Sequence, residues 1–316
     1  MRYVRCDDLA KDWSVLTLGC WQLAPSEGWG DVCPPADADA VVKAALDCGI
    51  TAFDTAEGYG DGESERRLGR ALGHKKDDVI IVSKIWPDAE LTLAAYQRRL
   101  EGTLRALGRD YVDVYLVHWP GAYFNTKEKS QKLCELMFGL KAGGKAKRVG
   151  LSNFHARDLA LLGERIARFS INQVPYSLLE RKYEGESAER CRDAEIKFMA
   201  YSPTARGLLA GRIDREALKP EARQHNALFR EPLFGHALKV YEQVKAVADE
   251  LRRKPIEVAL AWVLARENIM TAAVGTRHAG QVRQFTTAGD LELSPEHLHR
   301  LTAASDAFLA AKSRIH

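Results

Sequence analysis

Residues 51–84 hold the stretch that decides the fold: Thr51-Ala52-Phe53-Asp54, then a charged segment over Glu63–Leu72, then Val79-Ile80-Ile81-Val82-Ser83-Lys84. The first and last segments are short apolar runs, which are typical of buried parallel strands. The middle segment carries its charges on one face, which is typical of an amphipathic helix. The stretch therefore predicts a strand–helix–strand unit with parallel strands.

The same unit recurs along the chain. Strands are predicted at Val15–Cys20, Thr51–Ala56, Val79–Lys84, Val112–His118, Arg148–Asn153, Ser170–Val174, Lys197–Tyr201 and Thr271–Thr276. Helices are predicted at Ala36–Cys48, Glu63–Leu72, Leu93–Leu107, Lys127–Leu140, Ala156–Ile166, Ala188–Glu195, Ala237–Arg253, Pro255–Arg266 and Gln281–Ala288. Eight units without a Pro-, Ser- or Gly-rich linker predict an α/β fold: one domain over residues 1–316, closed as a (β/α)8 TIM barrel. An open doubly wound sheet gives the same alternation and remains the alternative.

Three further segments frame this barrel. The residues before Val15 are expected to form an N-terminal cap over the barrel floor. Pro203–Pro232 is an insertion between the seventh strand and the next helices. Ser294-Pro295-Glu296 opens a terminal helix, with Ser as the N-cap and Pro at the first helical position.

Composition excludes several classes of protein. The 316 residues are 46% hydrophobic, with a net charge of +3. Basic and acidic residues are interspersed, so no nucleic-acid partner is expected. No run approaches the ~18 apolar residues of a membrane span, and the start at Met1 lacks a signal region, so a cytoplasmic protein is expected.

The six cysteines form no Cys-x-x-Cys pair, and their spacing suits neither a metal site nor a disulfide framework. We expect no metal. Cys20, near a strand end, is a candidate for lining a pocket. The outer helices show no excess apolar face that would predict an oligomeric state.

Two glycine-rich motifs fail as phosphate sites. Gly58-Tyr59-Gly60-Asp61-Gly62 lies where a dinucleotide fingerprint would lie, but Glu63 replaces the third glycine and would repel a pyrophosphate. Gly139–Lys145 resembles a phosphate loop, but Ala146 replaces the required Ser or Thr and the segment runs from helix to strand. Gly143-Gly144 is instead expected to end a helix.

Four polar residues at or just beyond the ends of apolar runs form the strongest functional pattern: Asp54, Tyr59, Lys84 and His118. Each alone fits a structural role, but strand ends of a barrel point toward one pocket. A carboxylate keeps a buried Lys charged, and an adjacent ammonium lowers the pKa of a Tyr hydroxyl from its usual value of about 10. An imidazole can donate to a carbonyl oxygen. The set is an acid site suited to reducing a C=O bond.

The chain resembles the aldo-keto reductase superfamily over nearly its whole length. The resemblance is carried in the family's order by Phe53-Asp54-Thr55-Ala56-Glu57-Gly58-Tyr59-Gly60, Ser83-Lys84, Leu116-Val117-His118-Trp119-Pro120, Val149-Gly150-Leu151-Ser152-Asn153-Phe154, Asn172-Gln173-Val174-Pro175-Tyr176 and Tyr201-Ser202-Pro203-Thr204-Ala205-Arg206-Gly207-Leu208-Leu209. The family is a (β/α)8 barrel that binds a nicotinamide cofactor without a dinucleotide fingerprint.

The resemblance implies roles for these positions. Tyr59 would be the general acid, tuned by Lys84 and Asp54, while His118 orients the carbonyl. Ser152, Asn153 and Gln173 would bind the cofactor carboxamide, and Tyr201 would stack under the nicotinamide ring. The pyrophosphate would meet Ser202, Thr204, Arg206, Gly207 and Leu208. The adenosine end would meet Gly275, Thr276, Arg277 and Gln281, where Arg277 pairs with a 2′-phosphate and favours NADPH (NADP+), with NADH as the alternative.

The chain departs from the family's pattern at two places. Gln284 and Phe285 stand where many members have Glu and Asn, so Phe285 either stacks on adenine or packs. The last strand, Ala272-Ala273-Val274-Gly275, lacks the common Ile-Pro-Gly. In the insertion, His225, Asn226 and Arg230 are expected to form a solvated loop and not a cover for the cofactor.

Trp21, Trp86 and Trp119 each follow a strand end and are predicted to wall the substrate pocket, with Trp29 and Tyr123 as weaker candidates. The prediction is an NADPH-dependent reductase of an aldehyde or ketone, acting on a small carbonyl substrate. One alternative is a sugar or polyol dehydrogenase running toward NAD(P)+ reduction. The other is a cofactor-sensing binding subunit like the potassium-channel β subunits, which share the fold and the four catalytic residue types.

Overall fold

Eight parallel strands close into a barrel in this computed structural model, which describes residues 1–25, 33–213 and 221–315. The strands are β3 (Leu16–Gly19), β4 (Ala52–Asp54), β5 (Ile80–Ile85), β6 (Val112–Val117), β7 (Ala146–Ser152), β8 (Ile171–Pro175), β9 (Lys197–Tyr201) and β10 (Ile269–Gly275). They follow chain order around the barrel, and β10 pairs with β3 in parallel to close it. The closed barrel is confirmed and the open sheet is excluded.

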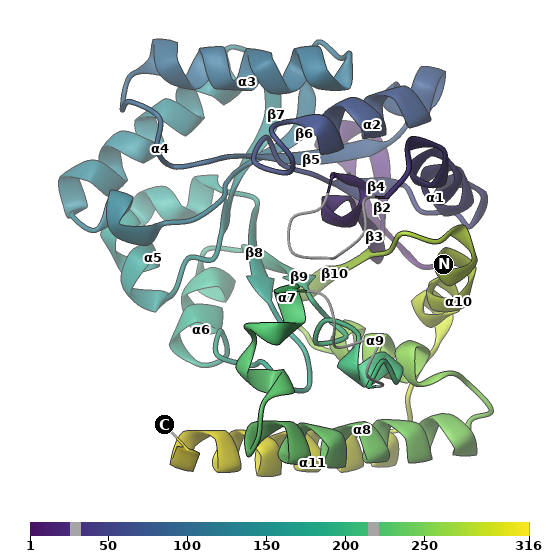
Figure 1. The fold of residues 1–316 in the computed structure, drawn as a ribbon. Helices are drawn as coiled ribbons and strands as arrows, with labels where there is room; N and C mark the ends of the chain where they lie inside the picture. The colour runs from purple at the N-terminus through teal and green to yellow at the C-terminus, as the bar shows by residue number, and fades with distance from the viewer. Residues whose placement is uncertain (26–32, 214–220, 316) are drawn as a thin grey trace.

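Helices surround the barrel on its outside (Figure 1). In the described residues they are α1 (Pro35–Asp47), α2 (Glu63–Leu72), α3 (Leu93–Leu107), α4 (Lys127–Ala142), α5 (Ala156–Leu162), α6 (Glu186–Asp193), α7 (Glu221–Gln224), α8 (Leu233–Glu250), α9 (Pro255–Leu264), α10 (Ala279–Phe285) and α11 (Pro295–Ile315). Figure 1 shows α8 and α11 running side by side along one edge of the molecule.

Local sequence explains where several helices begin. Thr92 and Thr126 cap α3 and α4 by accepting hydrogen bonds from the backbone N–H groups of Ala95 and Lys129. Ser294 caps the terminal helix through the His297 N–H, at 3.2 Å, as predicted. These caps satisfy N–H groups that the helices leave unpaired.

One predicted helix is shorter than expected. The segment Ala156–Ile166 divides into α5 and a 3₁₀ turn over Gly163–Arg168. Gly163 has a φ of +59°, which interrupts the α-helical backbone and which glycine tolerates best. Gly143-Gly144 does follow the end of α4, with Gly144 at a φ of +77°.

The hairpin β1 (Tyr3–Cys6) and β2 (Lys11–Ser14) covers the barrel floor, which confirms the predicted cap. Trp13 on β2 is fully buried and packs with residues of the barrel interior. Its Nε1 donates to Thr17 Oγ1 at 3.1 Å, at the start of the barrel. The hairpin therefore closes the end of the barrel opposite to the strand ends that carry the predicted site.

Candidate active site

The four predicted catalytic residues meet at the carboxyl ends of three neighbouring strands. Asp54 ends β4, Lys84 lies in β5, His118 follows β6, and Tyr59 lies in the turn after β4. Lys84 Nζ lies 2.8 Å from Asp54 Oδ1 and 3.2 Å from the Tyr59 hydroxyl. The rings of Tyr59 and His118 meet edge to face, with centroids 5.6 Å apart. The sequence pattern therefore describes one site in space.

Burial sets the charges of this group. Burial lowers the pKa of Lys84, but Asp54 and Tyr59 outweigh it, so the net shift is upward and Lys84 stays charged. Burial, with a smaller contribution from Lys84, holds the pKa of His118 well below its usual value, so the imidazole is neutral at pH 7. A neutral imidazole can still donate one N–H to a carbonyl oxygen.

The net shift of Tyr59 differs from the expectation. Lys84 does lower the pKa of Tyr59, but burial raises it more, so the pKa lies above the usual value for tyrosine. The spacing of residues in the sequence reveals the ammonium but not the loss of water around the phenol. Tyr59 therefore carries its proton at neutral pH, which is the state that a proton donor needs.

A second group of predicted residues lies beside the first. Asn153 donates to the His118 carbonyl at 3.1 Å, and the Tyr201 hydroxyl donates to Asn153 Oδ1 at 2.9 Å. Ser152 Oγ donates to the Gln173 carbonyl at 3.1 Å. Asn153 has a φ of +66°, a backbone strain of the kind that clusters at functional sites. These residues occupy the rim next to the catalytic group.

The turn after β9 has an unusual backbone. Ser202, Ala205 and Arg206 all have φ values between +50° and +58°. The side chains of Ser202, Thr204 and Arg206 line the cavity, as does Gly207. Leu208 does not, because its side chain is fully buried in the hydrophobic core, so any contact with a ligand there is left to its backbone.

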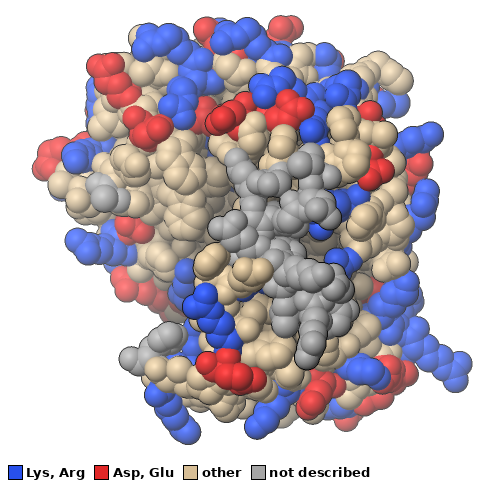
Figure 2. Space-filling model, viewed as in Figure 1, with Lys and Arg blue, Asp and Glu red and all other residues tan. Residues whose placement is uncertain are grey.

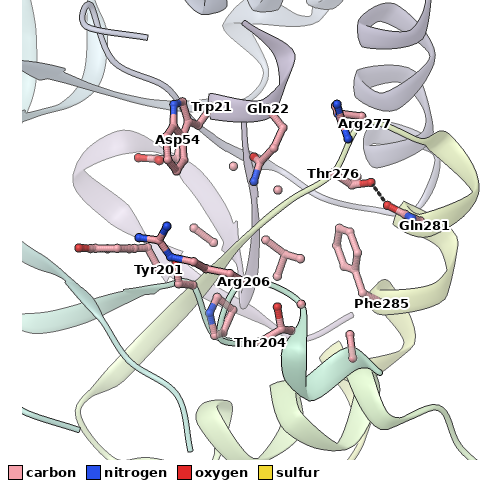
Figure 3. Close-up of a pocket in the computed structure, with 18 of the residues that line it drawn as sticks. Trp21, Gln22, Asp54, Tyr201, Thr204, Arg206, Thr276, Arg277, Gln281 and Phe285 are labelled. Atoms are coloured by element: carbon pink, nitrogen blue, oxygen red, sulfur yellow. Dashed lines mark hydrogen bonds between the residues drawn. The ribbon is translucent and has the colours of Figure 1, made fainter. Parts of the chain in front are cut away.

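Predicted adenosine-end residues gather at the other end of the same cavity. Figure 3 shows Thr276, Arg277, Gln281 and Phe285 grouped away from Asp54, Trp21 and Tyr201. The Thr276 hydroxyl donates to Gln281 Oε1. Phe285 is almost fully buried and is one of the residues that line the cavity.

The cavity has a volume of about 700 Å³. Among its described lining residues, Asp54 is the one carboxylate, and both of its oxygens bond Lys84. Five basic side chains line the same cavity: Arg206, Arg212, Arg223, Lys254 and Arg277. This excess of positive charge suits a ligand with several phosphates.

Sequence reasoning assigned no role to several lining residues: Gln22, Arg212, Arg223, Lys254, His278 and Gln284. Gln22 lies on a one-turn helix after β3, and its amide approaches Gly275 so closely that a Cβ there would lie 1.9 Å from Gln22 Oε1. Arg223 on α7 donates to the Arg206 carbonyl at 2.8 Å. Apart from Gln284, which the departures from the family pattern singled out, no local pattern marks these residues, because distant segments bring them to the cavity.

The aromatic wall is largely as predicted. Trp21, Trp86 and Trp119 line the cavity. Trp86 packs edge to face against His118 with centroids 5.2 Å apart, and Trp21 stacks on Tyr59 at 6.1 Å. Tyr123 is 44% exposed and does not line the cavity, and Trp29 lies outside the described residues.

Cys20 and three residues of the insertion lie away from the cavity. Cys20 does not line the cavity, because its side chain is fully buried in the core beneath Asp54. Of the described insertion, Arg223 reaches the cavity, whereas His225, Asn226 and Arg230 do not line it. Besides the predicted Thr204, Arg206 and Gly207, the described part of the insertion thus adds residues such as Arg223 that the sequence did not single out.

On the face shown in Figure 2, Lys and Arg are interspersed with Asp and Glu among the described residues, as composition led us to expect. None of the described helices combines the length and the apolar character that a membrane span requires.

Comparison with known proteins identifies the family. A model described as the aldo/keto reductase family matches residues 15–306. The aldo-keto reductase YhdN of Bacillus subtilis is 30% identical over 308 residues, covering 94% of this chain and 91% of that protein. The NADH-specific methylglyoxal reductase of Escherichia coli is 29% identical over 306 residues, covering 89% and 91%.

Solved structures of similar fold include an aldo/keto reductase and a glycerol dehydrogenase. An aldo/keto reductase from Klebsiella pneumoniae, in complex with NADP and acetate, has a TM-score of 0.72 at 29% identity, covering 92% of this chain and 91% of that one. A glycerol dehydrogenase from Gluconobacter oxydans has a TM-score of 0.81 at 26% identity, covering 98% and 95%. The chain belongs to the aldo-keto reductase family and is an NAD(P)H-dependent oxidoreductase, which confirms the resemblance seen in its sequence.

Proposed function

We propose that this enzyme reduces an aldehyde or ketone to an alcohol with NADPH, using Tyr59 as the proton donor. The observation that carries the proposal is the hydrogen-bonded series Asp54–Lys84–Tyr59, with neighbouring distances of 2.8 and 3.2 Å, beside a neutral His118 at one end of the cavity. This places a protonated phenol, an ammonium and an imidazole around one point on the rim.

The cavity residues fit a nicotinamide dinucleotide phosphate. Amide and hydroxyl groups of Ser152, Asn153 and Gln173 would hold the carboxamide beside the catalytic group. The five basic side chains match the phosphates, and Arg277 would pair with the 2′-phosphate. Phe285 offers an aromatic ring for the adenine. The bound reduced nicotinamide supplies a hydride to the carbonyl carbon.

The chain's own residues do the rest of the chemistry. His118 donates a hydrogen bond that holds the carbonyl oxygen next to the Tyr59 hydroxyl. Tyr59 transfers its proton to that oxygen as negative charge develops on it. Lys84 stabilises the resulting phenolate, and Asp54 keeps Lys84 charged. Trp21, Trp86 and Trp119 exclude water from one side and favour substrates with an apolar or planar surface.

The test is a fluorescence titration of the purified protein with NADPH and NADH, followed by the decay of absorbance at 340 nm with a carbonyl panel. Methylglyoxal belongs in that panel because two relatives from Escherichia coli are named as methylglyoxal reductases. Binding with turnover supports the proposal. Binding without turnover on any carbonyl contradicts the reductase function, and absence of binding contradicts the cofactor.

A second candidate is oxidation of a polyol, which the structural likeness to a glycerol dehydrogenase favours. The same acid group would then act in reverse, with Tyr59 accepting a proton. The ratio of oxidative to reductive kcat/KM, measured with glycerol and with glyceraldehyde, distinguishes the two directions.

A further inference from the structure

One hydrogen bond joins the predicted carboxamide site to the catalytic acid group. Gln173 Nε2 donates to Asp54 Oδ1 at 2.7 Å. The same oxygen lies 2.8 Å from Lys84 Nζ, which in turn lies 3.2 Å from the Tyr59 hydroxyl. Gln173 is therefore the first member of a series of contacts that ends at the proton donor.

This bond crosses the barrel. Gln173 lies on β8 and Asp54 on β4, and three strands separate them on either side of the closed sheet. Both side chains are buried, with relative exposures of 3% and 5%. The bond thus connects opposite walls of the barrel mouth at the level of the catalytic group.

Hydrogen bonds from neighbouring residues hold the backbone of Gln173 in place. Its carbonyl accepts hydrogen bonds from the Asn153 backbone N–H at 2.8 Å and from Ser152 Oγ at 3.1 Å. An amide side chain offers two N–H donors and one acceptor oxygen. One N–H donates to Asp54 and Nε2 also contacts Met199 Sδ at 3.2 Å, so the amide oxygen is the group left to bind a cofactor carboxamide.

We propose that Gln173 is a positioning residue for the proton donor, acting through Asp54, in addition to its predicted contact with the cofactor. This inference rests on the proposed function. The donated N–H fixes the rotation of the Asp54 carboxylate, and that rotation fixes Lys84 against Tyr59. Without the donor, the carboxylate turns toward Lys84 alone, and Lys84 is drawn away from the Tyr59 hydroxyl.

The experiment compares Gln173→Met with Ser152→Ala. Both variants lose a predicted carboxamide contact, but only Gln173→Met loses the bond to Asp54. At saturating NADPH we expect kcat to fall about tenfold further in Gln173→Met than in Ser152→Ala, while NADPH affinity falls by similar factors in both. Equal losses of kcat in the two variants would overturn the inference, because loss of a cofactor contact alone would then explain the effect of Gln173→Met.

A second measurement needs no turnover. Thermal unfolding midpoints are measured for Gln173→Met, Asp54→Asn and the double variant of the full chain. We expect the effects to be non-additive by about 2 °C or more, because the two side chains contact each other. Additive effects would overturn the bond itself. Absence of turnover in the unmodified enzyme would instead contradict the proposed function. The thermal comparison would still show whether Gln173 and Asp54 contact each other.

Discussion

At the scale of single residues, the candidate site contains groups whose pKa values differ from those in water. Tyr59 and Lys84 both have raised pKa values, while that of His118 is lowered. At neutral pH these shifts keep Lys84 charged, Tyr59 protonated and His118 neutral. The protonated state of Tyr59 is the one that the proposed proton donor requires.

Replacing Tyr59 by Phe tests the acid role. We expect Tyr59→Phe to lower carbonyl reduction by about 10²-fold or more, because the proton donor is lost. NADPH binding, measured by fluorescence, should stay nearly unchanged. Tyr123→Phe is the matched control, since Tyr123 is exposed and does not line the cavity. Retained turnover in Tyr59→Phe would rule out the proposed acid.

Replacing Arg277 tests the choice of cofactor. Arg277→Ala should weaken NADPH binding by about 10- to 100-fold, the size expected for losing a hydrogen-bonded charge contact, and should change NADH binding much less. Arg283→Ala is the control, because Arg283 is exposed on the neighbouring helix turn of α10. Equal weakening of both cofactors would remove the argument for a 2′-phosphate contact.

At the scale of elements, α2 connects the outer layer to the strand that carries Lys84. Glu65 on α2 is buried, and Ser83 Oγ on β5 donates to it at 2.5 Å. Burial raises the pKa of Glu65 to about 7, whereas Ser83, Thr103 and Lys84 lower it and Glu57 raises it. The folded protein therefore binds a proton at Glu65 that the unfolded chain releases near pH 4.5.

This shift predicts a pH dependence of stability. Because the folded pKa exceeds the unfolded one, Glu65 contributes less to stability as pH rises from about 4.5 to 7. The free energy of unfolding of Glu65→Gln, relative to the parent, should therefore rise by about 2–3 kcal/mol between pH 5 and pH 8. Urea unfolding at both pH values measures it. A difference that does not change with pH would refute the raised pKa.

Two glycines, one in α2 and one in α3, are predicted to respond in opposite ways to substitution by Ala. A Cβ on Gly69 of α2 would lie 2.3 Å from the Leu107 carbonyl oxygen, whereas a Cβ on Gly102 of α3 would meet nothing within 4 Å. Gly69→Ala should destabilise by about 1–3 kcal/mol through the forced separation of the helices. Gly102→Ala should stabilise by up to about 1 kcal/mol, since Ala favours the helix. Thermal unfolding of both variants checks the pair.

At the scale of the whole molecule, the barrel is closed by a hairpin at one end and carries its site at the other. Trp13 fills the interior at the floor and packs with Ile80 and Val114 of the barrel strands. Basic residues from segments far apart in the chain converge at the opposite end. The floor hairpin and the candidate site thus lie at opposite ends of the barrel, the arrangement usual for this fold.

Truncating the floor should therefore affect stability more than the site. Trp13→Ala should lower the free energy of unfolding by about 3–5 kcal/mol, because it leaves a large cavity in the barrel. Val4→Ala on the same hairpin should cost less than about 1 kcal/mol, since Val4 is 37% exposed. Urea unfolding measures both. If Trp13→Ala costs as little stability as Val4→Ala, the hairpin contributes little to the barrel core.

Much of the fold could be predicted from local patterns. The strand and helix ends lie within a few residues of those predicted, because apolar periodicity and capping residues act over short distances. The predicted catalytic residues Asp54, Lys84 and His118 could be placed together because the carboxyl ends of consecutive parallel strands share one rim. For the same reason the three pocket tryptophans lie where they were expected.

The remaining features depend on contacts that no local pattern encodes. The pairing of β10 with β3 distinguishes a barrel from an open sheet, and it joins segments more than 250 residues apart. Arg223 and Gln22 reach the cavity from separate short helices, and the raised pKa of Tyr59 comes from its burial. By itself the sequence determined which residues end each strand. The tertiary structure decided which of them meet across the barrel, as Gln173 and Asp54 do, and how far water is excluded from their charges.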